Sequence, residues 1–256
     1  MAYIIAHRGA SADAPENTLA AFRLAWAQGA DGIEGDFCLS ADRQIVCIHD
    51  ADTLRVAGQK HVVKDTCFAD LQALDVGGWK GERWLGERIP SLEDVLAAVP
   101  AGKKIVLELK AGPEIVAPLA ENLKRSAHAG ENILLISLVD ATVAECKRRL
   151  PPIKCHWLSG YEKCTGGAGG THGWTPTADD VIATIRRLGA DGFGSEAKPE
   201  IFDEAFVRRL RAAGINEFHV WTVDEGAVGR FYERLGAWGI TTNRPGFLRA
   251  ELGESL

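Results

Sequence analysis

The sequence lacks long apolar runs and clusters of basic residues. None of its 256 residues lie in a run approaching the roughly 18 to 20 apolar positions that a membrane-spanning helix needs. Its 29 lysines and arginines are outnumbered by 35 acidic residues, and they form no dense basic run of the kind that binds nucleic acid. These absences predict a protein without stable membrane insertion and without DNA or RNA as a main partner.

Paired cysteines and an export signal are also missing. The six cysteines are scattered without a C-x-x-C pair, so we predict neither a zinc site nor a dense disulfide framework, and buried thiols are the simpler interpretation. The first residues, MAYIIA, enter a strand-like run without a basic segment or a small-residue cleavage site. We therefore expect a cytoplasmic protein.

What the chain does contain is a regular alternation of β-rich runs and helical segments. Strand character is found at residues 3–7, 32–39, 104–110, 133–138, 153–158, 192–195, 217–221 and 239–242. Helical periodicity is found at residues 18–28, 92–99, 114–129, 141–149, 178–188, 199–213 and 225–235. Eight strands with intervening helices in about 250 residues predict an α/β fold, a (β/α)8 TIM barrel, as a single domain over residues 1–256.

Two segments interrupt this alternation. A further β run at residues 45–49 is followed by a small insertion, residues 50–90, which we interpret as a cap over the barrel mouth. A glycine-rich segment, residues 161–175, follows the fifth strand on the face where barrel active sites form. It carries Lys163 and His172, which are weaker candidates for ligand contacts than for positions in an ordinary glycine-rich loop.

Acidic side chains occur inside two of the predicted strands. Glu34 and Asp36 are two residues apart and therefore share one face of the second strand. Glu108 and Lys110 repeat this pattern on the third strand, near the catalytic end of a barrel. Three carboxylates without a soft ligand favour Mg²⁺ or Ca²⁺ over zinc. The alternative is a set of buried ion pairs with Lys110 and Arg8, which is costly to desolvate.

Two histidines flank the first acidic strand. His7 and Arg8 end the first strand, and His49 ends the β run after the second strand. The planar guanidinium of Arg8 suits a phosphate or a carboxylate. Two imidazoles beside a carboxylate-bound cation form the apparatus of a phosphodiesterase, in which one histidine removes a proton and the other delivers one to the departing alkoxide.

These residues resemble the glycerophosphodiester phosphodiesterases along nearly the whole chain. The matching motifs are Ala6-His7-Arg8-Gly9, Pro15-Glu16-Asn17-Thr18, Glu34-Gly35-Asp36, His49-Asp50, Ile89-Pro90-Ser91-Leu92-Glu93, Leu107-Glu108-Leu109-Lys110, Trp221-Thr222-Val223 and Ile240-Thr241-Thr242-Asn243-Arg244-Pro245. The resemblance implies that His7 and His49 are the acid/base pair and that Glu34, Asp36 and Glu108 bind the metal. It also implies that Arg8 and Lys110 contact the phosphate and that Trp221 lines the substrate pocket.

The chain departs from the family pattern in small ways. Asp224 stands where family members commonly have asparagine, and Phe37-Cys38-Leu39-Ser40 replaces a valine-rich stretch that usually ends in threonine. We expect neither departure to reach a catalytic atom. His219 lies two residues before Trp221, one layer deeper in the barrel, and is interpreted as a packed core histidine.

The resemblance implies a metal-dependent hydrolase that cuts glycerophosphodiesters into glycerol 3-phosphate and an alcohol. Which histidine is the acid stays open, as does the choice between direct attack by water and a cyclic phosphate intermediate. One alternative is an enzyme of the lysophospholipase D type or one directed at sphingolipids, which would need an apolar groove. Another is a catalytically silent barrel that binds phosphorylated metabolites, which would be expected to lose a histidine or a metal ligand.

Overall fold

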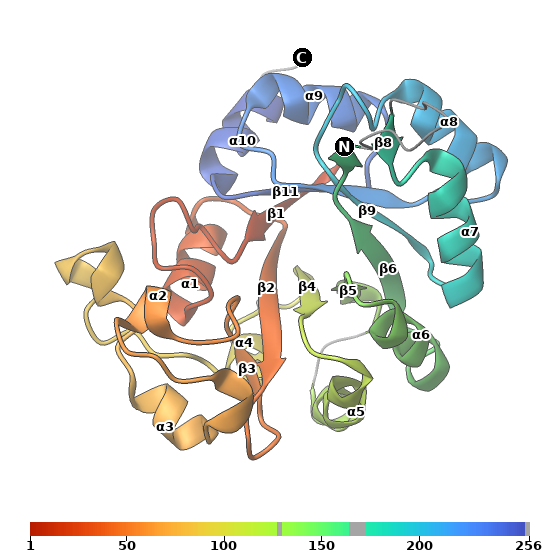
Figure 1. The fold of residues 1–256 in the computed structure, drawn as a ribbon. Coiled ribbons are helices and arrows are strands. Elements are labelled where there is room, and N and C mark those ends of the chain that lie inside the picture. Colours follow the sequence, from red (N-terminus) through yellow and green to blue (C-terminus); the bar gives the residue numbers. More distant parts are fainter. Residues whose placement is uncertain (127–129, 164–172, 254–256) are drawn as a thin grey trace.

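The computed structural model describes residues 1–126, 130–163 and 173–253, and its centre is a closed ring of parallel strands (Figure 1). Their hydrogen-bonded order is β1-β11-β10-β9-β6-β5-β4-β2, and pairing of β1 with β2 closes the ring. The strands are β1 (Tyr3–His7), β2 (Gly32–Leu39), β4 (Lys104–Leu109), β5 (Ile133–Ser137), β6 (Lys154–Ser159), β9 (Gly192–Glu196), β10 (Phe218–Trp221) and β11 (Gly239–Thr242). The predicted TIM barrel is confirmed.

Helices surround this ring because each one buries an apolar face against the strands (Figure 1). They are α1 (Leu19–Ala27), α4 (Leu92–Ala97), α5 (Val116–Arg125), α6 (Asp140–Arg149), α7 (Ala178–Leu188), α8 (Glu204–Ala212), α9 (Gly226–Arg234) and α10 (Pro245–Gly253). Among the described residues, no helix combines the length and the apolar content needed to cross a bilayer.

The main differences between the observed helices and the sequence prediction concern α8, α5 and α10. Helix α8 begins at Glu204 rather than at residue 199, because the Asp203 side chain accepts the backbone N–H of Phe206 and caps the helix there. Helix α5 begins only after a 3₁₀ turn, η4 (Pro113–Ile115), and residues 127–129 lie outside the described part of the chain. Helix α10 was not predicted, although Pro245 is typical of a first helical turn.

The barrel interior changes character along its axis. Ile5, Val106, Leu134, Ile136 and Leu158 form an apolar cluster inside the ring. Burying a side chain of this kind stabilises the fold by about 1.5 to 3 kcal/mol. The side chains of Glu34, Glu108 and His7 are found nearer the carboxyl ends of the strands, so the apolar cluster supports a polar mouth.

The insertion forms a small layer of its own beside β2. Strand β3 (Ile45–Cys47) pairs antiparallel with β2, and after it come α2 (Leu54–Ala57), η1 (Val63–Asp65), α3 (Phe68–Ala73), η2 (Gly78–Lys80) and η3 (Glu82–Trp84). Val46, Val63 and Leu71 contribute to a separate apolar core. Lys80 Nζ donates to the carbonyl oxygen of Ser11 at 2.7 Å, which ties the insertion to the loop after β1.

Candidate active site

The carboxyl ends of the barrel strands surround a cavity of about 210 Å³. Side chains from opposite sides of the ring line it, as expected where parallel strands end together. Seven of the residues singled out in the sequence line this cavity: His7, Arg8, Glu34, His49, Glu108, Lys110 and Trp221. Asp36, the eighth, is 1% exposed and contacts two of the lining side chains.

Three carboxylates meet on the neighbouring strands β2 and β4. Parallel pairing places Asp36 opposite Glu108, and Glu34 lies two residues earlier on the same face of β2. One ligand oxygen from each residue lies within 4.8 Å of the others. Glu34 Oε1 and Asp36 Oδ1 are buried and have no hydrogen-bond partner among the described residues. Buried oxygen atoms at this spacing suit a hard divalent cation.

Two cationic side chains compensate part of this negative charge. Lys110 Nζ lies 2.9 Å from Glu108 Oε1 and 3.6 Å from Asp36 Oδ1. Arg8 Nε lies 3.1 Å from Asp36 Oδ2. Burial, followed by repulsion from Asp36 and Glu108, nevertheless raises the pKa of Glu34 well above its ordinary value. The carboxylate cluster therefore favours a further positive charge, which is the electrostatic signature of a cation site.

The backbone after β1 is shaped to reach the acidic strand. Arg8 has φ 57° and Gly9 has φ 81°, so two consecutive residues adopt the left-handed conformation. A Cβ atom on Gly9 would lie 2.6 Å from Ala21 Cβ, so both the conformation and the close packing require glycine. This turn lets the backbone N–H of Arg8 donate to Glu34 Oε2 at 2.9 Å.

His7 is held by an amide at the end of β11. Its Nδ1 lies 2.8 Å from Asn243 Oδ1, which also accepts the Ser11 hydroxyl at 2.8 Å. Asn243 Nδ2 donates to Asp224 Oδ2 at 2.7 Å, so the amide oxygen must face His7. His7 then donates from Nδ1, and its Nε2 is left with a lone pair. Burial and the adjacent Arg8 lower the pKa of His7.

His49 is held by a carboxylate. Its Nδ1 lies 2.7 Å from Asp50 Oδ1, and Arg55 Nε donates to Asp50 Oδ2 at 2.6 Å. Burial opposes ionisation of Asp50, but hydrogen bonds from Arg55 and His49 lower its pKa to about 2. The guanidinium of Arg55 also donates twice to Glu16, at 2.8 Å each, and Arg8 Nη1 donates to Glu16 at 2.9 Å. One ionic network therefore joins the insertion, the loop after β1 and His49.

Some residues of the site escaped the sequence interpretation. Asn17, which has φ 58°, donates from Nδ2 to Asp36 Oδ2 at 2.8 Å. It belongs to the motif Pro15-Glu16-Asn17-Thr18, but no function was predicted for it from the sequence. Arg55 belongs to the insertion and carries no motif at all. Of the weaker candidates, Lys163 lies exposed in β7 (Glu162–Lys163), and His172 lies outside the described residues.

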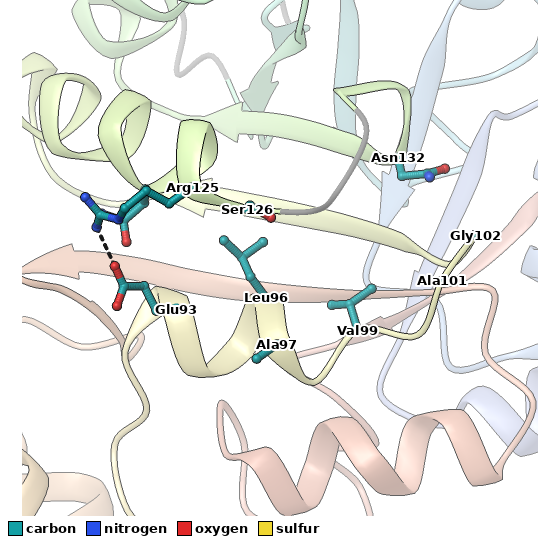
Figure 2. Close-up of a pocket in the computed structure, with 10 residues that line it drawn as sticks. Glu93, Leu96, Ala97, Val99, Ala101, Gly102, Arg125, Ser126 and Asn132 are labelled. Carbon is teal, nitrogen blue, oxygen red and sulfur yellow. Dashed lines mark hydrogen bonds and ion pairs between the residues drawn. The ribbon is translucent and has the colours of Figure 1, made fainter.

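A larger groove on the outside of the barrel offers no comparable chemistry. It measures about 740 Å³ and lies between α4 and α5, with Leu96, Ala97 and Val99 on one wall (Figure 2). Its one lining carboxylate, Glu93, is paired with Arg125. The smaller cavity at the strand ends is therefore the candidate active site.

Comparisons with known proteins identify the family to which this chain belongs. The glycerophosphoryl diester phosphodiesterase family matches residues 7–156 and 170–247. A glycerophosphodiester phosphodiesterase of Caldanaerobacter subterraneus is 35% identical over 155 residues, which are 59% of this chain and 64% of that protein. One of Bacillus subtilis is 28% identical over 254 residues, covering 94% of this chain and 83% of that protein.

A solved structure extends the comparison to the whole barrel. The Oleispira antarctica phosphodiesterase, in complex with the product sn-glycerol-3-phosphate, has 26% sequence identity and a TM-score of 0.85, with 98% of this chain and 97% of that chain covered. The alignments with the first two curated relatives span only 47% and 64% of their lengths. The family match and the barrel together establish that this chain belongs to the glycerophosphoryl diester phosphodiesterase family.

Proposed function

We propose that this protein is a metal-dependent phosphodiesterase that hydrolyses glycerophosphodiesters to glycerol 3-phosphate and an alcohol. The observation that carries the proposal is the convergence of two histidines, three carboxylates and two cations around one cavity of about 210 Å³. A silent binding barrel would not need two histidines with separate polar partners. The solved relative that holds sn-glycerol-3-phosphate supports this choice of product.

Glu34, Asp36 and Glu108 would hold one divalent cation, Mg²⁺ or Ca²⁺. Their oxygen donors are hard, they lie close enough to share an ion, and two of the oxygen atoms are buried without a hydrogen bond among the described residues. When bound, the cation supplies charge neutralisation at the phosphate and lowers the pKa of an attacking hydroxyl or water.

Arg8 and Lys110 would orient the phosphodiester. Both line the cavity, and their side chains are 19% and 21% exposed, so each can reach a ligand. Neighbouring carboxylates outweigh the effect of burial and raise the pKa values of both side chains, which therefore stay protonated. A guanidinium and an ammonium group on one wall suit a phosphate better than they suit a neutral ligand.

The polar partners suggest different roles for the two histidines. His7 is neutral, donates from Nδ1 to an amide oxygen and keeps a lone pair on Nε2, so it acts as the base that takes the proton of the attacking hydroxyl or water. His49 faces the ionised Asp50, and this carboxylate holds the imidazole through Nδ1 and leaves Nε2 for the substrate. His49 therefore delivers the proton to the departing alkoxide as its bond to phosphorus breaks.

The test is hydrolysis of glycerophosphocholine by the purified protein with Mg²⁺ or Ca²⁺. We expect EDTA to abolish the activity and added cation to restore it, and Glu34→Gln to weaken metal binding measured by calorimetry. Full activity after exhaustive chelation would contradict the metal assignment. Wild-type metal affinity in Glu34→Gln would remove this residue from the ligand set.

A lysophospholipid substrate is the second candidate. Leu138 lines the cavity, and it is 49% exposed at the end of β5, where an acyl chain could contact it. Comparing kcat/KM for glycerophosphocholine with that for a long-chain lysophosphatidylcholine separates the two. A clear preference for the lysolipid would replace the proposed substrate class and leave the chemistry unchanged.

A further inference from the structure

Two buried histidines lie in the barrel interior, on strands that flank β9. His156 and His219 are 0% and 2% exposed, and their Nδ1 atoms are 3.0 Å apart. Their rings stack with centroids 5.2 Å apart. His156 Nε2 lies 3.0 Å from Glu217 Oε1, and Glu217 is also bound by Lys154. Neither histidine has a part in the proposed acid/base chemistry.

Strand β9 is built to make room for this pair. A Cβ atom on Gly192 would lie 2.6 Å from His156 Nε2, and a Cβ atom on Gly194 would lie 2.4 Å from His219 Cε1. Both separations are shorter than real side chains tolerate. Strand β9 thus has glycine at two positions inside the barrel, where large apolar residues are usual, and the space left by the missing side chains is filled by two imidazoles. This cost argues for a use beyond packing.

The hydrogen-bond partners determine where the protons are. The carboxylate of Glu217 only accepts, so His156 donates to it from Nε2, and in its neutral form presents a lone pair on Nδ1. His219 must then donate from its own Nδ1. Its Nε2 keeps a lone pair, is buried, and has no hydrogen-bond partner among the described residues. Burial holds the pKa of His219 well below its ordinary value, which agrees with a neutral ring.

His219 lies at the bottom of the candidate active site. It lines the same cavity as His7, Glu108 and Lys110, and it stands two residues before Trp221 on β10, hence on the same face and one layer deeper. Other walls at this depth are apolar, among them Ile136 and Leu158. A fixed acceptor in such surroundings is left unsatisfied unless a ligand donates to it.

We propose that His219 Nε2 accepts a hydrogen bond from a glycerol hydroxyl of the ligand and is a specificity-determining residue for the polyol end of the substrate. The inference rests on the proposed function for the identity of the ligand. Arg8 and Lys110 hold the phosphate beside the carboxylates, and the uncharged glycerol extends toward the bottom of the cavity. His156 and Glu217 act as positioning residues, because they fix the tautomer of His219.

Binding of two matched ligands tests this proposal. Calorimetry on the Mg²⁺-saturated protein compares glycerol 3-phosphate with n-propyl phosphate, which has the same length and charge and no hydroxyl. We expect the wild-type protein to prefer glycerol 3-phosphate by about tenfold, the value of one hydrogen bond to a buried acceptor. His219→Leu should bring the ratio close to one, and His219→Gln, which keeps an acceptor oxygen, should restore part of it.

Two results would overturn the inference. One is a His219→Leu variant that binds both ligands with wild-type affinity. The other is a His219→Leu variant that loses affinity for both ligands by the same factor, so that the preference for glycerol 3-phosphate is unchanged; this indicates a purely structural role. If His219→Leu does not fold, ¹⁵N NMR of the wild-type imidazoles decides instead. The His219 Nε2 signal should be that of an unprotonated nitrogen and should move with glycerol 3-phosphate but not with n-propyl phosphate; a protonated or unresponsive Nε2 contradicts the proposal.

The assay of glycerophosphocholine hydrolysis separates this inference from the proposed function. If the wild-type protein hydrolyses glycerophosphocholine but binds glycerol 3-phosphate and n-propyl phosphate equally, the role of His219 is refuted and the proposed function stands. Discrimination between the ligands without hydrolysis refutes the proposed activity and supports the hydroxyl site.

Discussion

The barrel contains two pairs of histidines that differ in depth and in partners. His7 and His49 lie at the mouth, and each is held by a polar group from a loop, the amide of Asn243 or the carboxylate of Asp50. His156 and His219 lie deeper and are held by each other and by the contact of His156 with Glu217. The first arrangement leaves one nitrogen of each ring available for proton transfer, whereas the second fixes a tautomer inside the fold. The same residue type is therefore proposed to transfer protons at the mouth and to recognise a ligand hydroxyl below it.

The largest expected effect comes from removing a histidine at the mouth. His7→Ala or His49→Ala should lower kcat for glycerophosphocholine by about 10² to 10⁴, because proton transfer is lost. The midpoint of thermal unfolding should change little, since both side chains are partly exposed. Steady-state kinetics and circular dichroism measure the two quantities. Near-wild-type turnover by His49→Ala would remove it from the acid/base role.

A tenfold decrease in kcat is expected when Asp224 is replaced, because Asp224 holds Asn243, the residue that contacts His7. Asp224 accepts hydrogen bonds from the Thr242 hydroxyl, the Asn243 backbone and the Asn243 side chain. Asp224→Ala should let the Asn243 amide rotate and so lower kcat by about tenfold, the value of one lost hydrogen bond. Asp224→Asn should retain more activity. The sequence led us to expect that aspartate in place of asparagine at position 224 would not reach a catalytic atom. The structure shows that Asp224 is separated from the candidate His7 only by Asn243.

The deeper pair should respond in stability. In Gly194→Ala the new Cβ atom would lie 2.2 Å from Leu158 Cδ2 and 2.4 Å from His219 Cε1. Overpacking of this kind costs about 1 to 3 kcal/mol in the free energy of unfolding. Gly173→Ala is the matched control, because no atom of the described residues lies within 4 Å of its added Cβ. Equal unfolding midpoints for the two variants would show that β9 can move to accept the methyl group.

The smallest effect is a pH dependence of stability to which His219, the deepest of the cavity-lining histidines, contributes. Burial lowers the pKa of His219 below 6.5, so below pH 6.5 the unfolded chain binds a proton that the folded protein does not. The free energy of unfolding therefore falls as pH decreases below 6.5, by at most about 1.4 kcal/mol per pH unit for one group. Glu217, whose pKa is lowered to about 2, adds to this loss only below pH 4.5.

Urea unfolding at pH 7 and pH 5.5 measures the difference. His219→Leu should lose less stability than the wild-type protein over this interval, because it lacks the group that titrates. Parallel losses in the two proteins would assign the pH dependence to other groups.

The sequence by itself determined the barrel and most of the residues that line its mouth. Alternating β runs and helical periods are local patterns, and in a closed parallel sheet they leave few topologies to choose from. Acids two residues apart on a strand necessarily share a face, so the grouping of Glu34 with Asp36 followed directly. The pairing of Asp36 with Glu108 required only that the two strands be neighbours.

Only the tertiary structure decided which groups hold the proposed catalytic side chains. Arg55 reaches Asp50 and Glu16 from an insertion without a motif, and Asn243 meets His7 across 236 positions of sequence. His219, interpreted from the sequence as a packed core histidine, is 63 positions from His156, and the two became a pair only when β9 placed glycines between their strands. Such contacts depend on strand register and side-chain direction, which no local pattern in the sequence encodes.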